Sequence, residues 1–302
     1  MATKVFQKIY RNLINKYTLF TRFQIWRTKS KYPVKIIRNT STLNHPSIHF
    51  IHRYCTNNTG DIACGYYQYI NRIFAEYACL VHDINSVKFS LIKKNDIIVI
   101  GGGGLLNAST LWNYNIKKSA KLASKSIIWT AGFNSSINNE SVVKLEWEDF
   151  DLISVRDYEY QNFRFVPCAT CMLHELELEY PSIRKIGVIA HKDVLNHLPD
   201  DLKHFDFITN NAPLSKMIEF IGTSDIIVTN SYHAVYWSTL MQKKCILFAP
   251  RSEKYNYFKY PPVLYSGDLE FDISQAQIYP NSLDICRKLN MEYINDMKDL
   301  IS

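Results

Sequence analysis

The feature that most constrains the fold is a series of nine short apolar runs, separated for the most part by segments of helical character. Each run spans four to seven residues and is rich in Val and Ile. Runs of this length that alternate with helices are typical of parallel sheets built from β-α-β units. The runs occupy residues 34–38, 47–52, 96–101, 126–132, 152–155, 185–190, 205–210, 225–230 and 244–249.

The runs form two series, which residues 168–182 separate. Helices are predicted at 61–79, 109–125 and about 138–148 in the first series, and at about 213–222, 233–242 and 281–300 in the second. We therefore expect an α/β fold of two doubly wound, Rossmann-like domains that face one cleft. The first would span 33–167, 168–182 would be the linker, and 183–302 would form the second domain with the terminal helix.

The front of the chain is strongly basic. Residues 1–60 hold eleven Lys and Arg and no Asp or Glu, whereas the rest of the chain has a small excess of acids. Residues 4–27 have the apolar spacing of an amphipathic helix with Lys and Arg off the apolar stripe, which is typical of an anchor on anionic lipid. Residues 1–32 are thus predicted to bind a membrane surface. The alternatives are a helix packed on the core, or a nucleic-acid contact, for which no recognised module follows.

Composition and cysteine usage narrow the class of protein. A chain of 302 residues that is 47% hydrophobic is neither disordered nor collagenous. No run reaches the roughly 18 apolar residues of a membrane span, and no secretory leader is evident. Seven scattered cysteines indicate reduced thiols in the cytoplasm. Cys168 and Cys171 form a single C-x-x-C without a second ligand pair at matching spacing, so no metal is expected.

Three loops of the first half are candidate ligand-binding sites, because ligands of open α/β sheets bind at the carboxyl ends of the strands. Asn58 and Asp61 open a predicted helix, where Asp61 either caps exposed amides or contacts a ligand. Gly101, Gly102, Gly103 and Gly104 follow a strand and precede a predicted helix, where their bare backbone would receive an anion or allow close packing. Arg156 directly follows the candidate strand at 152–155; it would grip a carboxylate or phosphate, or pair with Asp157 or Glu159.

The second half has its own polar strand ends. Asn230, Ser231, Tyr232 and His233 lead from a strand into a helix. The dipole of a helix lowers the pKa of a histidine at its N-terminus, which leaves the ring suited to proton transfer near neutral pH; the alternative is a His that caps its own helix. His191 has the same placement after the run at 185–190. Further candidates for binding an anionic sugar phosphate are Arg251 and Lys254, in a loop rich in aromatics.

These motifs, in this order, resemble the polysaccharide pyruvyl transferases over residues 50–260. The resemblance rests on Asn58-x-Gly60-Asp61 and on residues 97–104 (IIVIGGGG), 154–157 (SVRD), 166–171 (VPCATC) and 229–237 (TNSYHAVYW). It implies a two-domain, glycosyltransferase-B-like (GT-B-like) fold. It also implies an enzyme that transfers the enolpyruvyl-derived group of phosphoenolpyruvate onto a sugar of a capsular or other cell-surface polysaccharide, or its lipid-linked precursor, as a pyruvate ketal.

The resemblance also implies roles for particular residues. His233 matches the proposed acid/base of the family, and Arg156 matches the arginine that holds the donor. Ser231 departs from the family, since many members carry Arg there, and Arg251 or Lys254 would replace that charge. No metal or organic cofactor is implied, phosphoenolpyruvate being a co-substrate. The expected partners are a sugar or lipid-linked oligosaccharide and an anionic membrane, with no nucleic acid.

Two further functions are compatible with the same sequence. One is a GT-B-type glycosyltransferase that uses a nucleotide-activated sugar in surface-polysaccharide synthesis. The other is an inactive scaffold of a membrane biosynthetic complex, which the four glycines and the polar strand ends make less attractive. For the pyruvyl transferase, we expect a location in the cytoplasm at the inner face of the plasma membrane, where the basic helix would hold it close to a lipid-linked acceptor.

Overall fold

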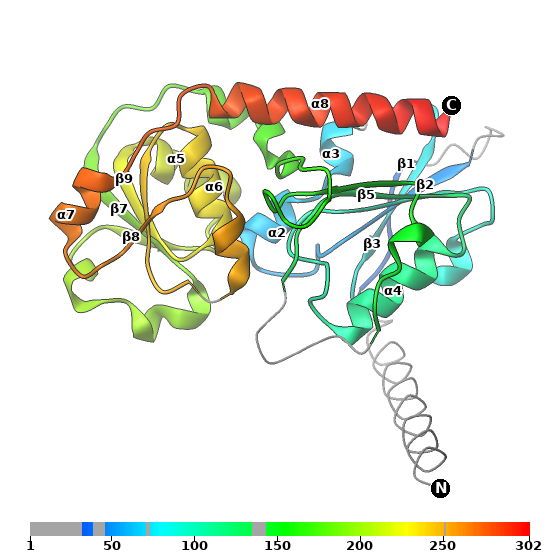
Figure 1. Cartoon of the computed structure of the whole chain (residues 1–302), viewed down its shortest axis with the longest axis horizontal. Helices are drawn as coiled ribbons and strands as arrows, with labels where there is room; N and C mark the ends of the chain where they lie inside the picture. The colour runs from blue at the N-terminus through cyan, green and yellow to red at the C-terminus, as the bar shows by residue number, and fades with distance from the viewer. Residues whose placement is uncertain (1–31, 39–45, 71–72, 135–142, 251) are drawn as a thin grey trace, which may run out of the picture.

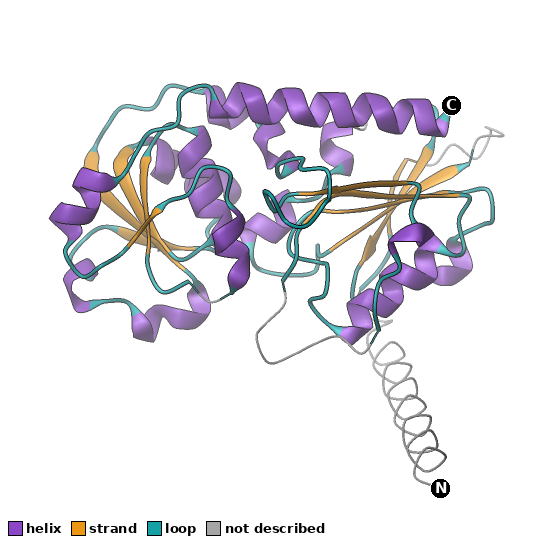
Figure 2. Cartoon of the chain, in the orientation of Figure 1, coloured by secondary structure: helices purple, strands orange, loops and turns teal. Residues whose placement is uncertain are grey.

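The computed structural model describes residues 32–38, 46–70, 73–134, 143–250 and 252–302. They form a mixed α/β fold with two sheets in which parallel pairing predominates (Figures 1 and 2). The predicted basic helix at 4–27 lies outside the described residues. Within them, no helix has both the length and the apolar character that crossing a bilayer requires.

The first sheet has six strands in the order β1-β3-β2-β4-β5-β6. All of its pairs are parallel except β1 with β3, which is antiparallel. The middle strands are buried on both faces, as expected for parallel strands covered by helices. The strands are β1 (Lys35–Arg38), β2 (Ser47–His52), β3 (Ala78–Asp83), β4 (Ile97–Gly101), β5 (Lys125–Ala131) and β6 (Leu152–Val155).

The second sheet has five strands in the order β11-β10-β9-β7-β8, all parallel. Its centre is the β7–β9 pair, which is buried almost throughout. The strands are β7 (Arg184–Ala190), β8 (Phe207–Thr209), β9 (Ser224–Thr229), β10 (Lys244–Leu247) and β11 (Val263–Leu264).

Helices cover the sheets and connect them. All nine residues of α6 are buried, since this helix lies between its own sheet and the elements of the first. The α-helices are α2 (Thr59–Ala63), α3 (Tyr67–Ile70), α4 (Thr110–Ala120), α5 (Leu214–Gly222), α6 (Tyr232–Leu240), α7 (Leu269–Gln275) and α8 (Ser282–Ile301). Short 3₁₀ turns lie at Phe89–Leu91, Trp147–Asp149, Ala169–Met172, His174–Glu177, Lys192–His197, Asp200–Leu202 and Glu253–Tyr257.

Helix α8 runs along both sheets (Figure 1). At its start, the Ser282 hydroxyl donates to the carbonyl of Thr239 at 3.0 Å, in the second half of the chain. Farther along, the Tyr293 hydroxyl donates to the carbonyl of Ile128 in β5 at 2.6 Å. The terminal helix, predicted to be part of the second domain, therefore also packs on the first sheet.

Each of the nine apolar runs overlaps a strand, which confirms the α/β pattern. The single helix predicted at 61–79 is wrong: α2 ends at Ala63, α3 covers one turn, and β3 begins at Ala78. Gly65 interrupts the helical pattern, and Cys79 and Val81 are taken up by pairing between β1 and β2.

Other local predictions also differ from the structure. The helix predicted at about 138–148 is absent from its described part, residues 143–148, where only a 3₁₀ turn begins at Trp147. The helix predicted at 109–125 ends at Ala120, because Lys125 already belongs to β5. Strand β11 and helix α7 were not predicted at all; both are short and lie on the outside of the second sheet.

Candidate functional site

Strand ends of the two sheets meet around one cavity of about 190 Å³, here called the site cavity. Most of its lining is polar, and most of its residues follow the carboxyl end of a strand, as the fold class predicts. The lining residues are Arg53, Asn58, Asp61, Gly104, Leu105, Trp112, Asn134, Arg156, His191, Ser231, Tyr232, His233, Lys254 and Tyr255. Nine of them were candidates on sequence grounds, so residues up to 196 positions apart converge.

Arg156, directly after β6, is the most unusual residue of the site cavity. It is only 3% exposed, yet its Nε and Nη1 have no hydrogen-bond partner among the described residues. The guanidinium lies over the ring of Tyr232, with Cζ 3.8 Å from the ring centroid. These two nitrogens therefore form no hydrogen bond with Asp157 or Glu159, which was the alternative predicted from the sequence. Buried polar groups are nearly always paired, so unpaired donors at a cavity indicate a place for an anion.

The neighbours of Arg156 support its charge and its position. A side chain at Gly132 would overlap the guanidinium, so this glycine leaves it room. Asp157 accepts a hydrogen bond from the Phe133 amide at 2.7 Å. Burial raises the pKa of Asp157 to about 6, against the opposing effect of Arg156. The pKa of Arg156 itself is raised: burial acts to lower it, but Tyr232 and Asp157 outweigh that effect.

His233 lies in the first turn of α6 and is 6% exposed. Its Nε2 is 3.2 Å from the sulfur of Cys64 and 3.7 Å from the sulfur of Cys168. A side chain at Gly60 would overlap the ring, so the turn of α2 fits closely against it. The hydrogen bonds of the ring go to thiols and not to the backbone of α6, so His233 does not cap its own helix. Its role in proton transfer stays a prediction.

The two thiols beside His233 differ in acidity. Burial, followed by the hydrogen bond with Cys168, raises the pKa of Cys64 well above the usual value. For Cys168, burial acts in the same direction, but hydrogen bonds with Cys64 and His233 outweigh it and hold the pKa well below the usual value. A negative charge in this group would therefore reside on Cys168, next to the imidazole.

Asn58 and Asp61 both line the site cavity, and it is Asn58 that caps the helix. Asn58 is the N-cap of α2, and its side chain accepts from the Gly60 amide at 3.1 Å. Asp61, for which capping was one of two predicted roles, forms an ion pair with Arg53 at 3.2 Å and is not the cap. The reason is positional: Asn58 precedes the helix in extended conformation, whereas Asp61 already lies in its first turn.

The glycine run divides between packing and the cavity. Gly104 lines the site cavity, whereas Gly101, Gly102 and Gly103 do not. At Gly102, φ is +83° and a Cβ would lie 2.5 Å from the carbonyl oxygen of Cys64, so no other residue fits without a shift. The helix predicted to follow the run, at 109–125, begins at Thr110 with Ser109 as its cap, so residues 105–109 separate the glycines from its N-terminus.

The remaining candidates are distributed as follows. His191, Ser231, Tyr232 and Lys254 line the site cavity. Asn230 does not line it; its side chain accepts from the His191 amide at 2.7 Å, which positions that loop. Arg251 lies outside the described residues.

Sequence reasoning missed several lining residues that had a usable signal. Arg53 follows β2 directly, and Asn134 follows β5 by three positions, so both satisfied the strand-end rule. Arg53 also lies near Trp112, with Cζ 5.7 Å from the ring centroid. Arg53 adds a cation to the cavity beside Arg156 and Lys254.

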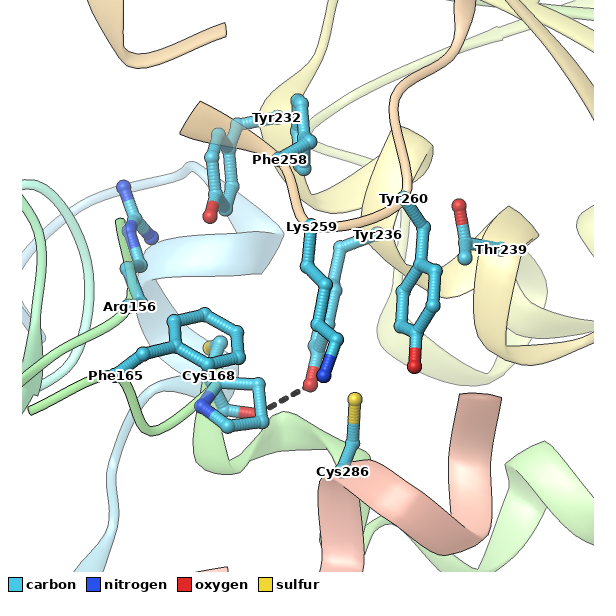
Figure 3. A pocket seen from close by; sticks show the side chains of 11 residues that line it. Arg156, Phe165, Cys168, Tyr232, Tyr236, Thr239, Phe258, Lys259, Tyr260 and Cys286 are labelled. Carbon is cyan, nitrogen blue, oxygen red and sulfur yellow. Dashed lines mark hydrogen bonds between the residues drawn. The ribbon is translucent and has the colours of Figure 1, made fainter. Parts of the chain in front are cut away.

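A second, smaller cavity of about 20 Å³ adjoins the first, since Arg156 and Tyr232 line both (Figure 3). Cys168 lies on its wall, and the Tyr236 hydroxyl donates to the Cys168 carbonyl at 2.8 Å. A volume of this size holds about one water molecule. Of these two adjoining cavities, the site cavity is the one with room for a substrate.

Comparison with known proteins gives three findings. The family model described as "Polysaccharide pyruvyl transferase" matches residues 7–252. No protein of curated function matches the chain. Among solved structures, a functionally uncharacterised protein from Klebsiella pneumoniae is 18% identical with a TM-score of 0.49, covering 73% of this chain and 93% of that one.

Proposed function

The chain belongs to the polysaccharide pyruvyl transferase family, and from that premise we propose that it transfers the pyruvyl group of phosphoenolpyruvate to a sugar as a ketal. The observation that carries the proposal is the buried Arg156, which lines the site cavity together with His233 and whose Nε and Nη1 have no hydrogen-bond partner among the described residues. A small, doubly negative donor is the kind of ligand that such a group would bind.

Phosphoenolpyruvate carries a phosphate and a carboxylate, so it needs cations at two places. Arg156 would bind one group bidentately, while Arg53 and Lys254, which line the same cavity, would face the other. These two residues offset the charge that Ser231 lacks relative to many family members. Asp61 balances part of the charge through its ion pair with Arg53.

The chemistry requires a proton at the methylene carbon of the enol. One sugar hydroxyl would add to C2 of phosphoenolpyruvate while His233 gives a proton to C3 and the hydroxyl proton leaves with solvent. A second hydroxyl of the same sugar would then displace phosphate, and its proton would return to His233. Because Nε2 faces the two thiols, Nδ1 is the nitrogen that would act in this transfer.

The proposal also includes the acceptor sugar, the location of the enzyme at the membrane and its domain arrangement. The sugar would be part of a capsular or other surface polysaccharide or of its lipid-linked precursor. Residues 4–27 would bind the protein to the inner face of the plasma membrane, so that acceptor and enzyme share one surface. In this proposal the two sheets belong to two Rossmann-like domains of a GT-B-like enzyme, divided at 168–182.

Incubation of the full chain with phosphoenolpyruvate and candidate glycans tests the proposal. Release of inorganic phosphate, together with the mass increase of a pyruvate ketal on the acceptor, is expected. Phosphoenolpyruvate should also raise the melting temperature of the wild type but not of Arg156→Met. The matched control is Arg164→Met, since Arg164 does not line the cavity.

The same experiment separates the alternatives. Thermal stabilisation by nucleotide sugars and none by phosphoenolpyruvate would contradict the proposal and favour a glycosyltransferase. An inactive scaffold predicts that His233→Ala still supports surface-polysaccharide synthesis in cells.

A further inference from the structure

Three potential metal ligands meet beside the site cavity: the sulfurs of Cys64 and Cys168 and Nε2 of His233, here called the thiol cluster. The two sulfurs are 3.8 Å apart. Nε2 lies 3.2 Å from the first and 3.7 Å from the second. All three residues are buried, and they come from the end of α2, the loop before the Ala169–Met172 turn, and the start of α6.

These separations are close to those of three ligands around one tetrahedral zinc ion. With Zn–S near 2.3 Å and Zn–N near 2.05 Å, tetrahedral angles place two sulfurs about 3.8 Å apart and sulfur and nitrogen about 3.6 Å apart. We propose that Cys64, Cys168 and His233 bind a thiophilic divalent cation, with Zn²⁺ as the reference ion. Two thiolates and an imidazole are ligands that such ions prefer, and a fourth position would remain for water or a substrate oxygen.

The surroundings hold the ligands in place without a metal. The backbone of Gly102 lies against Cys64 and that of Gly60 against His233, and a side chain at either glycine would displace its neighbour. Thr170 and Tyr66 bring hydroxyls to within 3.3 and 3.5 Å of the Cys168 sulfur. Hydroxyls in such positions can act as outer-shell donors to a metal-bound thiolate.

Without a metal ion, Nε2 of His233 and the two sulfurs have mainly one another as hydrogen-bond partners. Thiols are weak hydrogen-bond donors and acceptors, so two of them around a buried imidazole nitrogen replace water poorly. Among the described residues, all cysteines are free, so neither sulfur is used in a disulfide. A cation would bind the three groups together, and any proton still on a thiol would be released to solvent.

Occupancy has a consequence for His233, and this consequence alone rests on the proposed function. A metal on Nε2 holds the imidazole in its neutral form with a proton on Nδ1. The ring then cannot become an imidazolium, so it is no longer an acid near neutral pH. Metal loading and proton transfer would therefore exclude each other, and Zn²⁺ would inhibit the transferase.

Cobalt titration of the reduced, chelator-treated full chain tests the site without reference to activity. We expect one equivalent of Co²⁺ to give the near-ultraviolet thiolate-to-cobalt absorption and the visible bands of a tetrahedral ion. Cys64→Ser and Cys168→Ser should each weaken binding by at least about tenfold, since even outer-shell changes have effects of that size. Cys171→Ser is the matched control, being the other buried thiol of the C-x-x-C, and should keep the bands.

Absence of these bands in the folded wild type would overturn the proposal, as would equal binding by Cys64→Ser. Far-ultraviolet circular dichroism reports whether each variant folds. X-ray absorption of the zinc-loaded wild type needs no variant and should show two sulfurs and one nitrogen; a shell of oxygen and nitrogen alone would contradict the site.

The activity measurement separates this inference from the proposed function. Equimolar Zn²⁺ should lower phosphate release from phosphoenolpyruvate at least tenfold, and a chelator should restore it. The residual activity of Cys64→Ser should not respond to Zn²⁺. Cobalt bands without any transferase activity would refute the proposed function and leave the metal site standing. Full activity at saturating Zn²⁺ would refute the inhibition.

Discussion

Two of the places where elements of the two sheets meet treat buried polar groups in opposite ways. Along α8, Asn290 accepts from the Trp129 indole at 3.1 Å and donates to the Pro167 carbonyl at 3.0 Å. Arg287 donates to the carbonyls of Cys171 and Leu173 at 2.9 and 3.0 Å. At the site cavity, by contrast, two nitrogens of Arg156 have no partner among the described residues.

The difference separates structural from functional burial. A polar group that is paired on burial stabilises the fold, or at least does not weaken it, whereas an unpaired one costs free energy of folding. The α8 contacts therefore hold the two sheets together, and the site cavity keeps its donors for a ligand. Substitutions along α8 should lower the free energy of unfolding, whereas substitutions at the site cavity should lower transferase activity.

The largest effect is expected for Arg156→Met. Transferase activity should fall about a thousandfold, because several charge-assisted donors to the donor substrate are lost at once. The free energy of unfolding should stay within about 1 kcal/mol of the wild type or rise, because an incompletely paired buried cation is removed. Denaturant unfolding and initial rates measure the two quantities.

Arg287→Met is the matched control for that variant. It removes a paired guanidinium from α8 and should lower the free energy of unfolding by about 1–2 kcal/mol without changing the initial rate. A large loss of stability in Arg156→Met, equal to that of Arg287→Met, would remove the distinction between the two regions.

The second effect is a pH dependence of the free energy of unfolding, which is expected from Asp157, next to Arg156 in the chain. Its folded pKa of about 6 lies above the ordinary Asp value. The folded state therefore holds the proton more tightly, so the contribution of Asp157 to stability is full below about pH 4 and is lost as pH rises through 6. By linkage the loss is at most about 3 kcal/mol.

Asp157→Asn should remove this dependence. The difference in unfolding free energy between variant and wild type should therefore change in favour of the variant as pH rises from 4 to 7. Asp96 is a second carboxylate with a shifted pKa: burial acts to raise it, but hydrogen bonds with His49, Lys93 and Ser47 outweigh that effect and lower it. The double variant Asp96→Asn/Asp157→Asn therefore tests whether Asp96 contributes to the pH dependence of stability as well. A constant difference between Asp157→Asn and wild type would contradict the raised pKa.

The third effect belongs to α8. Asn290→Ala leaves the Trp129 N–H and the Pro167 carbonyl without their partner in a buried place, so the free energy of unfolding should fall by about 2 kcal/mol. Initial rates at low temperature should stay close to wild type, because Asn290 does not line the site cavity. Loss of activity with intact stability would show that α8 is part of the site.

The smallest effect is expected for Gly60→Ala. The added methyl group overlaps the His233 ring and displaces it, which should reduce the transfer rate about tenfold or more. Gly267→Ala is the control: its φ of +100° makes the change unfavourable, but nothing lies within 4 Å of the new methyl group. That variant should lose some stability and keep its activity. Equal rates in both would argue against a role for the position of His233.

Local sequence determined the elements and the candidate residues. The apolar runs that became strands are recognisable because strands buried on both faces need continuous Val and Ile, and the strand-end rule selected nine residues of the site cavity. The rule extends to Arg53, which was missed although it follows β2 directly. Strand β3 also contains a short apolar run, residues 78–81, but its first residues were assigned to the helix predicted at 61–79.

Only the tertiary structure decided which of these residues meet and which stay unpaired. Whether Arg156 pairs with Asp157 or waits for a ligand depends on side-chain directions that neighbouring residues do not dictate. The thiol cluster is the clearest case: a C-x-x-C alone predicts no metal, and Cys64, 104 positions before Cys168, gives no signal of its own. Ligands that are distant in the chain become neighbours only through packing between the sheets, because the fold and not the spacing sets their separation.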